Sequence, residues 1–199
     1  MAYHGADDVE FRDVLYRNRH GDVVGGGGSA SDFAINDKGV LGYYKGMGGP
    51  VTIPNSVTEI SDNAFYGCES VTSVTIPNSV TKIGEAAFSD CINLESVTIQ
   101  NSATSIGKIA FRNCISLKSV TMDGVTSIGD YAFYGCTNLP SINIPSSVTS
   151  IGDAAFANCG SLSYISVDSN NQYYKSIDGV LFNKAGTTLI CYPAGKTDS

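Results

Sequence analysis

The stretch VTIPNSVTKIGEAAFSDCINLES (74–96) decides the fold, because a near-copy, VTIQNSATSIGKIAFRNCISLKS (97–119), follows it directly. Three more copies stand at residues 51–73, 120–141 and 142–164, and only the copy at 120–141 is one residue shorter. One cysteine falls in each copy, at positions 68, 91, 114, 136 and 159. A constant period of about 20 to 29 residues predicts a solenoid in which the copies stack on one another.

Each copy is expected to form one strand, one turn and one short helical segment. Leu94, Val97 and Ile99 have the L-x-x-L-x-L spacing of a leucine-rich repeat, which puts Val97 and Ile99 on one face of a short strand. A Pro-Asn-Ser sequence or its equivalent then turns the chain. The Ala-Phe segment, for example Glu85–Cys91, is at most about two helical turns long, and its apolar side chains can face a common core.

Stacking buries the apolar side chains that one copy alone would leave in water. Equivalent side chains then lie above one another, about 4.8 Å apart from copy to copy. The phenylalanines should form one internal ladder: Phe65, Phe88, Phe111, Phe133 and Phe156. The cysteines should form another, as buried reduced thiols that pack like small apolar groups. Their constant spacing is typical neither of a disulfide framework nor of the close pairs that bind zinc.

Composition and motifs exclude several classes of function. The formal charge is −7 over 199 residues, so the chain lacks the basic surface that binds nucleic acid or anionic lipid. No apolar run reaches the length of a membrane span. The chain has two histidines and lacks the serine hydrolase, zinc protease and phosphate-loop motifs; Ile190 stands where a GKT motif at 195–197 would need glycine. We therefore predict no enzyme, no cofactor, no metal, no nucleic acid partner and no membrane insertion.

The repeat V-T-I-P-x-S-V-T-x-I-G-x-x-A-F-x-x-C-x-x-L-x-S resembles the BspA-like, or Treponema pallidum-type, leucine-rich repeats over about residues 33–199. The resemblance implies an α/β repeat solenoid, with a parallel β-sheet on one face, short helical or 3-10 segments on the other, and hairpin-like ends. It also implies a parent protein that is secreted or on the cell surface and binds a host matrix or cell-surface protein. No binding residue is implied, because the defining positions of the repeat are core positions.

The sequence changes on both sides of the five repeats at 51–164. Residues 32–50 are interpreted as an N-terminal cap, and residues 165–199 as an irregular C-terminal repeat or cap. In the latter, Asp178–Phe182 and Leu189-Ile190 are spaced as the two strands of a hairpin. Such hairpins would cover the end layers and strand edges of the stack. The chain as a whole is interpreted as a fragment.

Residues 1–24 lack the repeat and are separated from it by a Gly/Ser linker at 25–31. They form either a helix with Phe11, Val14 and Leu15 on one face, which we favour, or a hairpin; a disordered leader is the third alternative. The segment is a native partner-binding arm, through which the chain could also self-associate, or an appended ligand peptide.

Two outer surfaces of the solenoid can bind a partner. The strand face carries small uncharged residues and lacks the aromatic and arginine anchors of typical binding hot spots. The positions around the Ala-Phe pair are more varied, and we predict that partner-binding residues are Tyr66, Arg112, Tyr131 and Tyr134, with Phe11, Val14 and Leu15 in the arm. The predicted function is a non-enzymatic protein–protein interaction module of the bacterial surface-adhesin type. The alternative is an engineered solenoid scaffold that displays residues 1–24 as the functional ligand.

Overall fold

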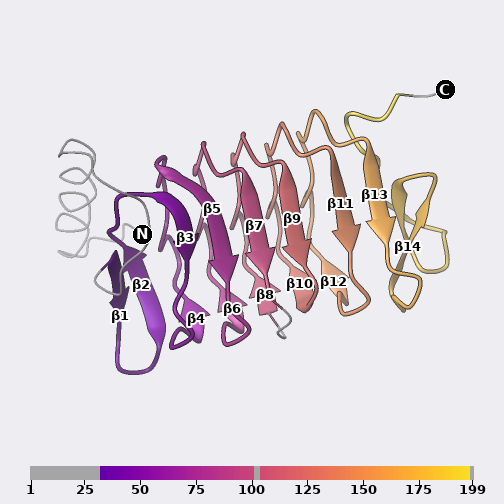
Figure 1. Cartoon of the computed structure of the whole chain (residues 1–199). Coiled ribbons are helices and arrows are strands. Elements are labelled where there is room, and N and C mark those ends of the chain that lie inside the picture. Colours follow the sequence, from indigo (N-terminus) through magenta and orange to yellow (C-terminus); the bar gives the residue numbers. More distant parts are fainter. Residues whose placement is uncertain (1–31, 101–103, 198–199) are drawn as a thin grey trace, which may run out of the picture.

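The computed structural model describes residues 32–100 and 104–197, which form a β-solenoid (Figure 1). We call one turn of the solenoid a coil. On one face, each coil contributes one strand to a row of parallel strands: β3 (Gly49–Thr52), β5 (Val71–Ile76), β7 (Ser96–Ile99), β9 (Ser119–Met122), β11 (Ser141–Ile144) and β13 (Tyr164–Val167). On the other face runs a seven-stranded sheet: β1 (Phe33–Ile35), β2 (Val40–Tyr44), β4 (Glu59–Ile60), β6 (Lys82–Ile83), β8 (Thr104–Ile106), β10 (Val125–Ile128) and β12 (Ser150–Ile151).

Register between coils follows the sequence repeat. Val74 of β5 is paired with Val97 of β7, and Val97 with Val120 of β9. Because side chains of a strand alternate between faces, this register sends the valine and isoleucine columns into the core of every coil. The threonine column between them, which includes Thr98, points outward.

Two internal ladders predicted from the sequence are present. Successive phenylalanine rings from Phe65 to Phe156 stack with centroids 4.6 to 5.8 Å apart, and Tyr44 extends the ladder by one ring, 4.8 Å from Phe65. The cysteines form no disulfide. Four of them are fully buried and each donates its thiol hydrogen to a phenylalanine carbonyl of the preceding coil; these are Cys91, Cys114, Cys136 and Cys159. Cys68 and Cys191 are only half-buried, which corrects the expectation for Cys68.

The predicted helical face is wrong: the Ala-Phe segments contain turns and no helix within the described residues. In one coil, Ile109 and Asn113 have φ angles of 49° and 57°, and such left-handed residues interrupt an α-helix. The amides of Ile109, Phe111 and Asn113 donate to the next coil, at 2.8 to 2.9 Å, whereas the amides between them close turns within their own coil. The molecule is therefore a β-solenoid rather than an α/β one, because coil-to-coil bonding replaces helical bonding.

Glycine allows the coils to approach closely beside four of the five Ala-Phe segments; Ser61 takes its place in the first. A Cβ atom on Gly107 would lie 2.7 Å from backbone atoms of Gly84, and one on Gly129 would lie 2.7 Å from those of Gly107. Real Cβ atoms do not reach such distances. The glycine column of the repeat thus reflects backbone contact between coils.

The row of front strands is interrupted once, between β9 and β11, which belong to separate sheets. Lys118 donates its amide to the carbonyl of Glu95 at 2.8 Å, and Ser163 donates to the carbonyl of Pro140 at 3.0 Å. Between these two coils the donor position is taken by Pro140, which has no amide hydrogen. The missing donor lies directly before the two strands that fail to pair.

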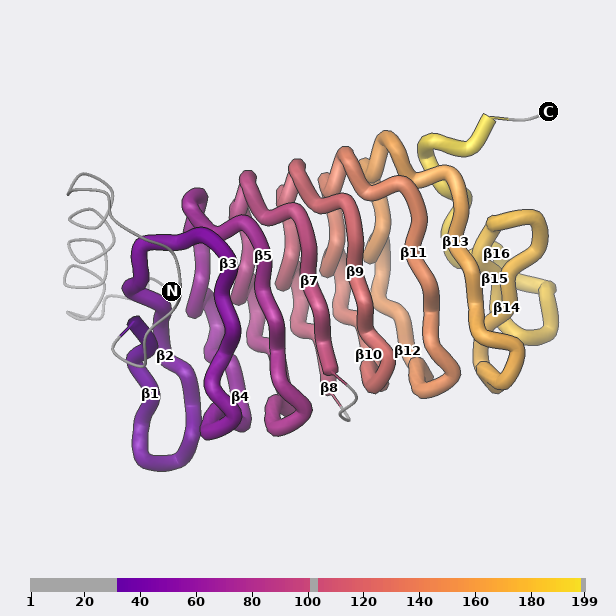
Figure 2. The backbone as a smooth tube through the Cα atoms, in the orientation of Figure 1, coloured from indigo at the N-terminus to yellow at the C-terminus, as the bar shows by residue number. Residues whose placement is uncertain are grey.

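Antiparallel strands stand at both ends of the array. β1 and β2 form a hairpin, and β2 then pairs in parallel with β4. At the other end β14 (Tyr174–Ile177), β15 (Val180–Asn183) and β16 (Leu189–Cys191) form a three-stranded sheet beyond β13 (Figure 2). The pairing of β15 with β16 confirms the hairpin expected there. The proposed divisions at 1–24 and 25–31 lie outside the described residues.

Asn171 attaches the terminal sheet to the solenoid. Its amide is fully buried and donates to the carbonyls of Pro145 and Val148, at 2.8 and 2.9 Å. Its carbonyl oxygen accepts the amides of Tyr173 and Tyr174, both at 2.8 Å. One side chain thereby satisfies four backbone groups, which a non-repeating segment would otherwise leave unpaired.

Candidate interaction surface

The predicted binding residues on the solenoid lie along the edge formed by the Ala-Phe segments, which we call the turn edge. Tyr66, Arg112 and Tyr134 occupy the position after phenylalanine in the first, third and fourth repeats. Phenylalanine is fully buried in these coils, so the next side chain points away from the core. Tyr66 and Arg112 are exposed, and Tyr134 is half-buried.

Three of the four residues are brought together. Tyr131 is 41 % exposed and packs against Tyr134 with ring centroids 5.8 Å apart in an edge-to-face arrangement. Arg112 lies one coil away, because its neighbour Asn113 donates its amide to the carbonyl of Tyr134 at 2.8 Å. Tyr66 lies two coils beyond Arg112, and the intervening residue, Ser89, is buried.

The isoleucines near this edge differ in exposure. Ile115 is 42 % exposed and lies in the same coil as Arg112, so it extends the apolar part of the edge. Ile92 and Ile109 are half-buried. The Arg112 coil and the Tyr134 coil therefore carry the continuous part of the surface.

Acidic residues on this edge act as bonds between coils. They stand at the start of the Ala-Phe segments, where the described residues form turns and no helix. A carboxylate oxygen of Asp62 accepts the amide of Glu85 at 2.7 Å, and one of Asp130 accepts the amide of Asp153 at 2.9 Å. Asp90 accepts the side-chain amide of Asn113 at 2.9 Å, so its charge is also engaged next to Arg112.

The strand face offers a flat polar surface. Its outward column is Thr52, Thr75, Thr98 and Thr121, which the register places side by side. No large apolar or charged side chain stands in this column, so it lacks an anchor that could enter a partner's pocket.

The described residues contain six reduced cysteines and no histidine. They contain no group of three or more metal-ligating side chains, and no helix that is long and apolar enough to cross a membrane. Burial raises the pKa of Cys91 and Cys114, so these thiols stay protonated and are poor nucleophiles. When one thiol of the Cys136–Cys159 pair ionises, the Cys136 thiol can donate to the Cys159 thiolate, which raises the pKa of Cys136 and lowers that of Cys159.

The structure exposes an apolar group that the sequence analysis did not predict. It lies around the terminal sheet: Tyr164, Tyr173, Ile177, Leu189, Ile190 and Tyr192, each at least 38 % exposed. In β15 and β16 apolar residues follow one another without alternation, so the sequence pattern did not show which of them would face solvent. The arm residues Phe11, Val14 and Leu15 lie outside the described part of the chain.

A profile of the BspA type leucine rich repeat region matches residues 49–162 and 122–185, in six copies. The chain belongs to the BspA-type leucine-rich repeat family. Among curated proteins no match was found. The family and the solenoid are those of repeat modules that bind other proteins and are in general not enzymes.

Solved structures with the same repeat come from several bacteria. The T. pallidum leucine-rich repeat protein has a TM-score of 0.61 and 29 % identity, over 69 % of this chain and 70 % of that protein. The pneumococcal vaccine antigen PcpA has a TM-score of 0.66 and 29 % identity, over 75 % and 38 %. A leucine-rich repeat protein from Bacteroides ovatus has a TM-score of 0.56 and 36 % identity, over 67 % and 40 %. This BspA-type chain thus spans less than half of the last two proteins.

Proposed function

We propose that this BspA-type chain is an adhesin-type binding module, and that the turn edge binds a host matrix or cell-surface protein. The observation that carries the proposal is the grouping of Arg112, Tyr131 and Tyr134 on adjacent coils, with Tyr66 on the same edge. Tyrosine and arginine are the residue types that most often dominate binding energy at protein interfaces.

A surface or secreted location of the parent protein is part of the same proposal. The support is the likeness to a pneumococcal protein described as a vaccine antigen, since an antigen of that kind must be accessible from outside the cell. The rigid stacking of coils also favours binding, because side chains held in place lose little conformational freedom when a partner docks.

Biolayer interferometry tests the proposal by measuring how the chain binds to a surface coated with solubilised basement-membrane proteins. Changing Tyr66, Arg112 and Tyr134 together to serine should lower the binding at least tenfold, as expected when hot-spot side chains are removed. The matched control changes Thr75, Thr98 and Thr121 to alanine on the strand face. Equal binding by both variants, with unchanged circular dichroism, would refute the turn edge as the binding surface.

The arm has its own proposal, in which residues 1–24 are the functional ligand on a solenoid scaffold, or mediate self-association, through Phe11, Val14 and Leu15. Deleting residues 1–31 separates the two proposals. Binding to the coated surface should survive the deletion if the turn edge is the binder, and should disappear if the arm is.

A further inference from the structure

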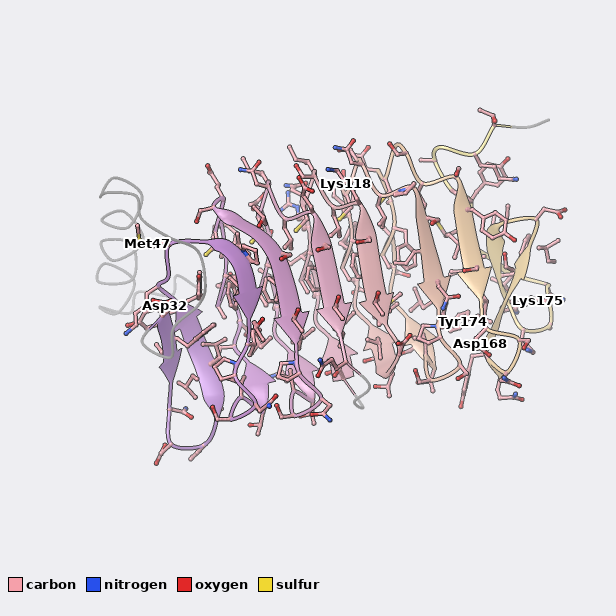
Figure 3. The ribbon with its side chains drawn as sticks, in the orientation of Figure 1. Asp32, Met47, Lys118, Asp168, Tyr174 and Lys175 are labelled. Atoms are coloured by element: carbon pink, nitrogen blue, oxygen red, sulfur yellow. The ribbon has the colours of Figure 1, made fainter. Side chains whose placement is uncertain are left out.

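Exposed apolar side chains concentrate at one end of the molecule. Of the ten large apolar side chains that stand exposed in the described residues, six lie between Tyr164 and Tyr192. Among the described residues near the opposite end, Met47 is the only large apolar side chain that is exposed (Figure 3). Phe33 and Tyr44 are buried there. The two ends of the solenoid therefore differ in what they offer to a partner.

The apolar side chains surround a strand edge. In the terminal sheet the strand order is β14-β15-β16, so β16 has a neighbour on one side only. Leu189 is 54 % exposed and Ile190 is 38 % exposed, so the side chains of this edge strand are accessible to a partner. An apolar edge strand of this kind readily pairs with another strand.

The charge at this end also permits contact between like molecules. The whole chain has a formal charge of −7, so most pairs of its surfaces repel each other. Residues 165–197 hold three lysines and two aspartates, and no charged residue lies within 185–195 around β16. The terminal sheet is thus a part of the acidic chain where two copies can meet without repulsion.

We propose that β16 pairs antiparallel with β16 of a second copy, about a twofold axis at Ile190, so that the two terminal sheets form one sheet of six strands. A twofold contact needs one surface that complements itself, whereas head-to-tail stacking needs complementary surfaces at both ends. Within the described residues the apolar surface lies at one end, and the strand Leu189–Cys191 carries no charge. Both features fit the twofold arrangement.

The contact is small, because it uses one three-residue strand and the apolar side chains beside it. Stable interfaces bury about 800 Å² on each partner, so we expect a dimer in the micromolar range that dissociates on dilution. Sedimentation velocity over a concentration series measures it. Ile190→Lys should raise the dissociation constant at least tenfold, because the twofold axis would bring two lysines together. The control is Tyr66→Lys on the turn edge, at a residue about as exposed as Ile190. It should leave the dissociation constant of the dimer unchanged.

Cross-linking tests the register. Residues directly opposite each other on antiparallel strands have Cα atoms about 4.5 to 5.5 Å apart, within disulfide range. Ile190→Cys should therefore give a covalent dimer on mild oxidation. Ile177→Cys is the control, since Ile177 is similarly exposed, at 43 %, but lies on β14, two strands from the proposed axis.

Three results would overturn the proposal. The first is a wild-type chain that stays monomeric up to high micromolar concentration. The second is a dimer that persists in Ile190→Lys, or that cross-links equally well through both cysteine variants. The third is loss of the dimer when residues 1–31 are deleted, which would assign the contact to the arm. Circular dichroism of each variant establishes that it is folded.

Discussion

Two residues in every coil have left-handed backbone conformations, and they set the path of the Ala-Phe turn. The position two residues after phenylalanine is Gly67, Asp90, Asn113, Gly135 or Asn158, all of which tolerate positive φ. The position two residues before phenylalanine is less obvious, since it includes Ile109 and Tyr131. There the hydrogen bond to the next coil holds a conformation that isoleucine alone would avoid.

The left-handed residues of the Ala-Phe turn mark the limit of prediction at the residue scale. The period, the strand faces, the phenylalanine ladder and most of the cysteine ladder follow from apolar spacing, and the structure has them. The turn conformation does not follow, because spacing alone suits a helix and a coil-to-coil ladder equally. Asn171 was also beyond reach, since two of its four bonds go to carbonyls 26 and 23 residues away, in a segment with which it shares no motif.

A methyl group at the glycine column tests how closely the coils approach. Gly107→Ala would place its Cβ 2.7 Å from backbone atoms of Gly84, which cannot rotate away. We expect a loss of about 1–3 kcal/mol in the free energy of unfolding, measured by urea denaturation. Gly160→Ala is the control, because nothing lies within 4 Å of the added atom. Similar stability of the two variants would contradict the close approach.

The buried thiols predict how stability depends on pH. Burial raises the pKa of Cys91 and Cys114 in the folded chain, while unfolded thiols ionise near pH 8.5. The folded state thus keeps protons that the unfolded state loses, so the thiols stabilise fully below about pH 8.5 and stability falls as pH rises beyond it. We expect a slope of about 1.4 kcal/mol per pH unit for each thiol, measured by denaturation under reducing conditions. In Cys114→Ala the slope should be shallower by that amount; an unchanged slope would argue against a buried thiol.

At the scale of elements, the ladder between coils is the unit that stabilises the structure. Each front strand is only four to six residues long and could not persist alone. Pairing in register with two neighbours gives it both hydrogen bonds and a buried face. A single missing donor in this ladder therefore affects whole strands, as the interruption between β9 and β11 illustrates.

Restoring that donor should join the two sheets. Pro140→Glu supplies an amide opposite the carbonyl of Lys118, as Lys118 itself supplies one to Glu95. We expect about 1 kcal/mol of added stability and slower amide hydrogen exchange in Ser141–Ile144. The reverse change, Ser163→Pro, removes the bond to the carbonyl of Pro140 and should accelerate exchange in β13. If exchange in β11 is unaffected, the interruption has another cause.

At the scale of the whole molecule, the strand pairings of the described residues join each coil to the next. Stability is then a sum over coils and the interfaces between them, and a defect in the middle separates the two halves. The turn edge could be located from the sequence because its tyrosines and arginine depart from the repeat consensus. The terminal apolar surface could not, because exposure there depends on whether another layer follows.

A cavity in the central ladder tests this coupling. Phe111 stacks between Phe88 and Phe133, with centroids 5.1 and 5.2 Å away, and is fully buried. Phe111→Ala should cost about 3–5 kcal/mol and let the halves on either side unfold separately, which hydrogen exchange with mass spectrometry can resolve. Phe182→Ala, at a half-buried residue of the terminal sheet, should cost less and leave the coils cooperative. If both variants unfold in one transition shared by all coils, stability is not coupled from neighbour to neighbour as described.

The in-register bonding of the coils has a genetic consequence. Because every regular coil presents the same donors on one side and the same acceptors on the other, a coil added or removed as a whole leaves its neighbours matched. Unequal recombination within the repeated DNA would produce such changes in steps of one repeat. Alleles of different repeat number should then fold equally well, and the length of the solenoid would vary between strains without any new fold having to arise.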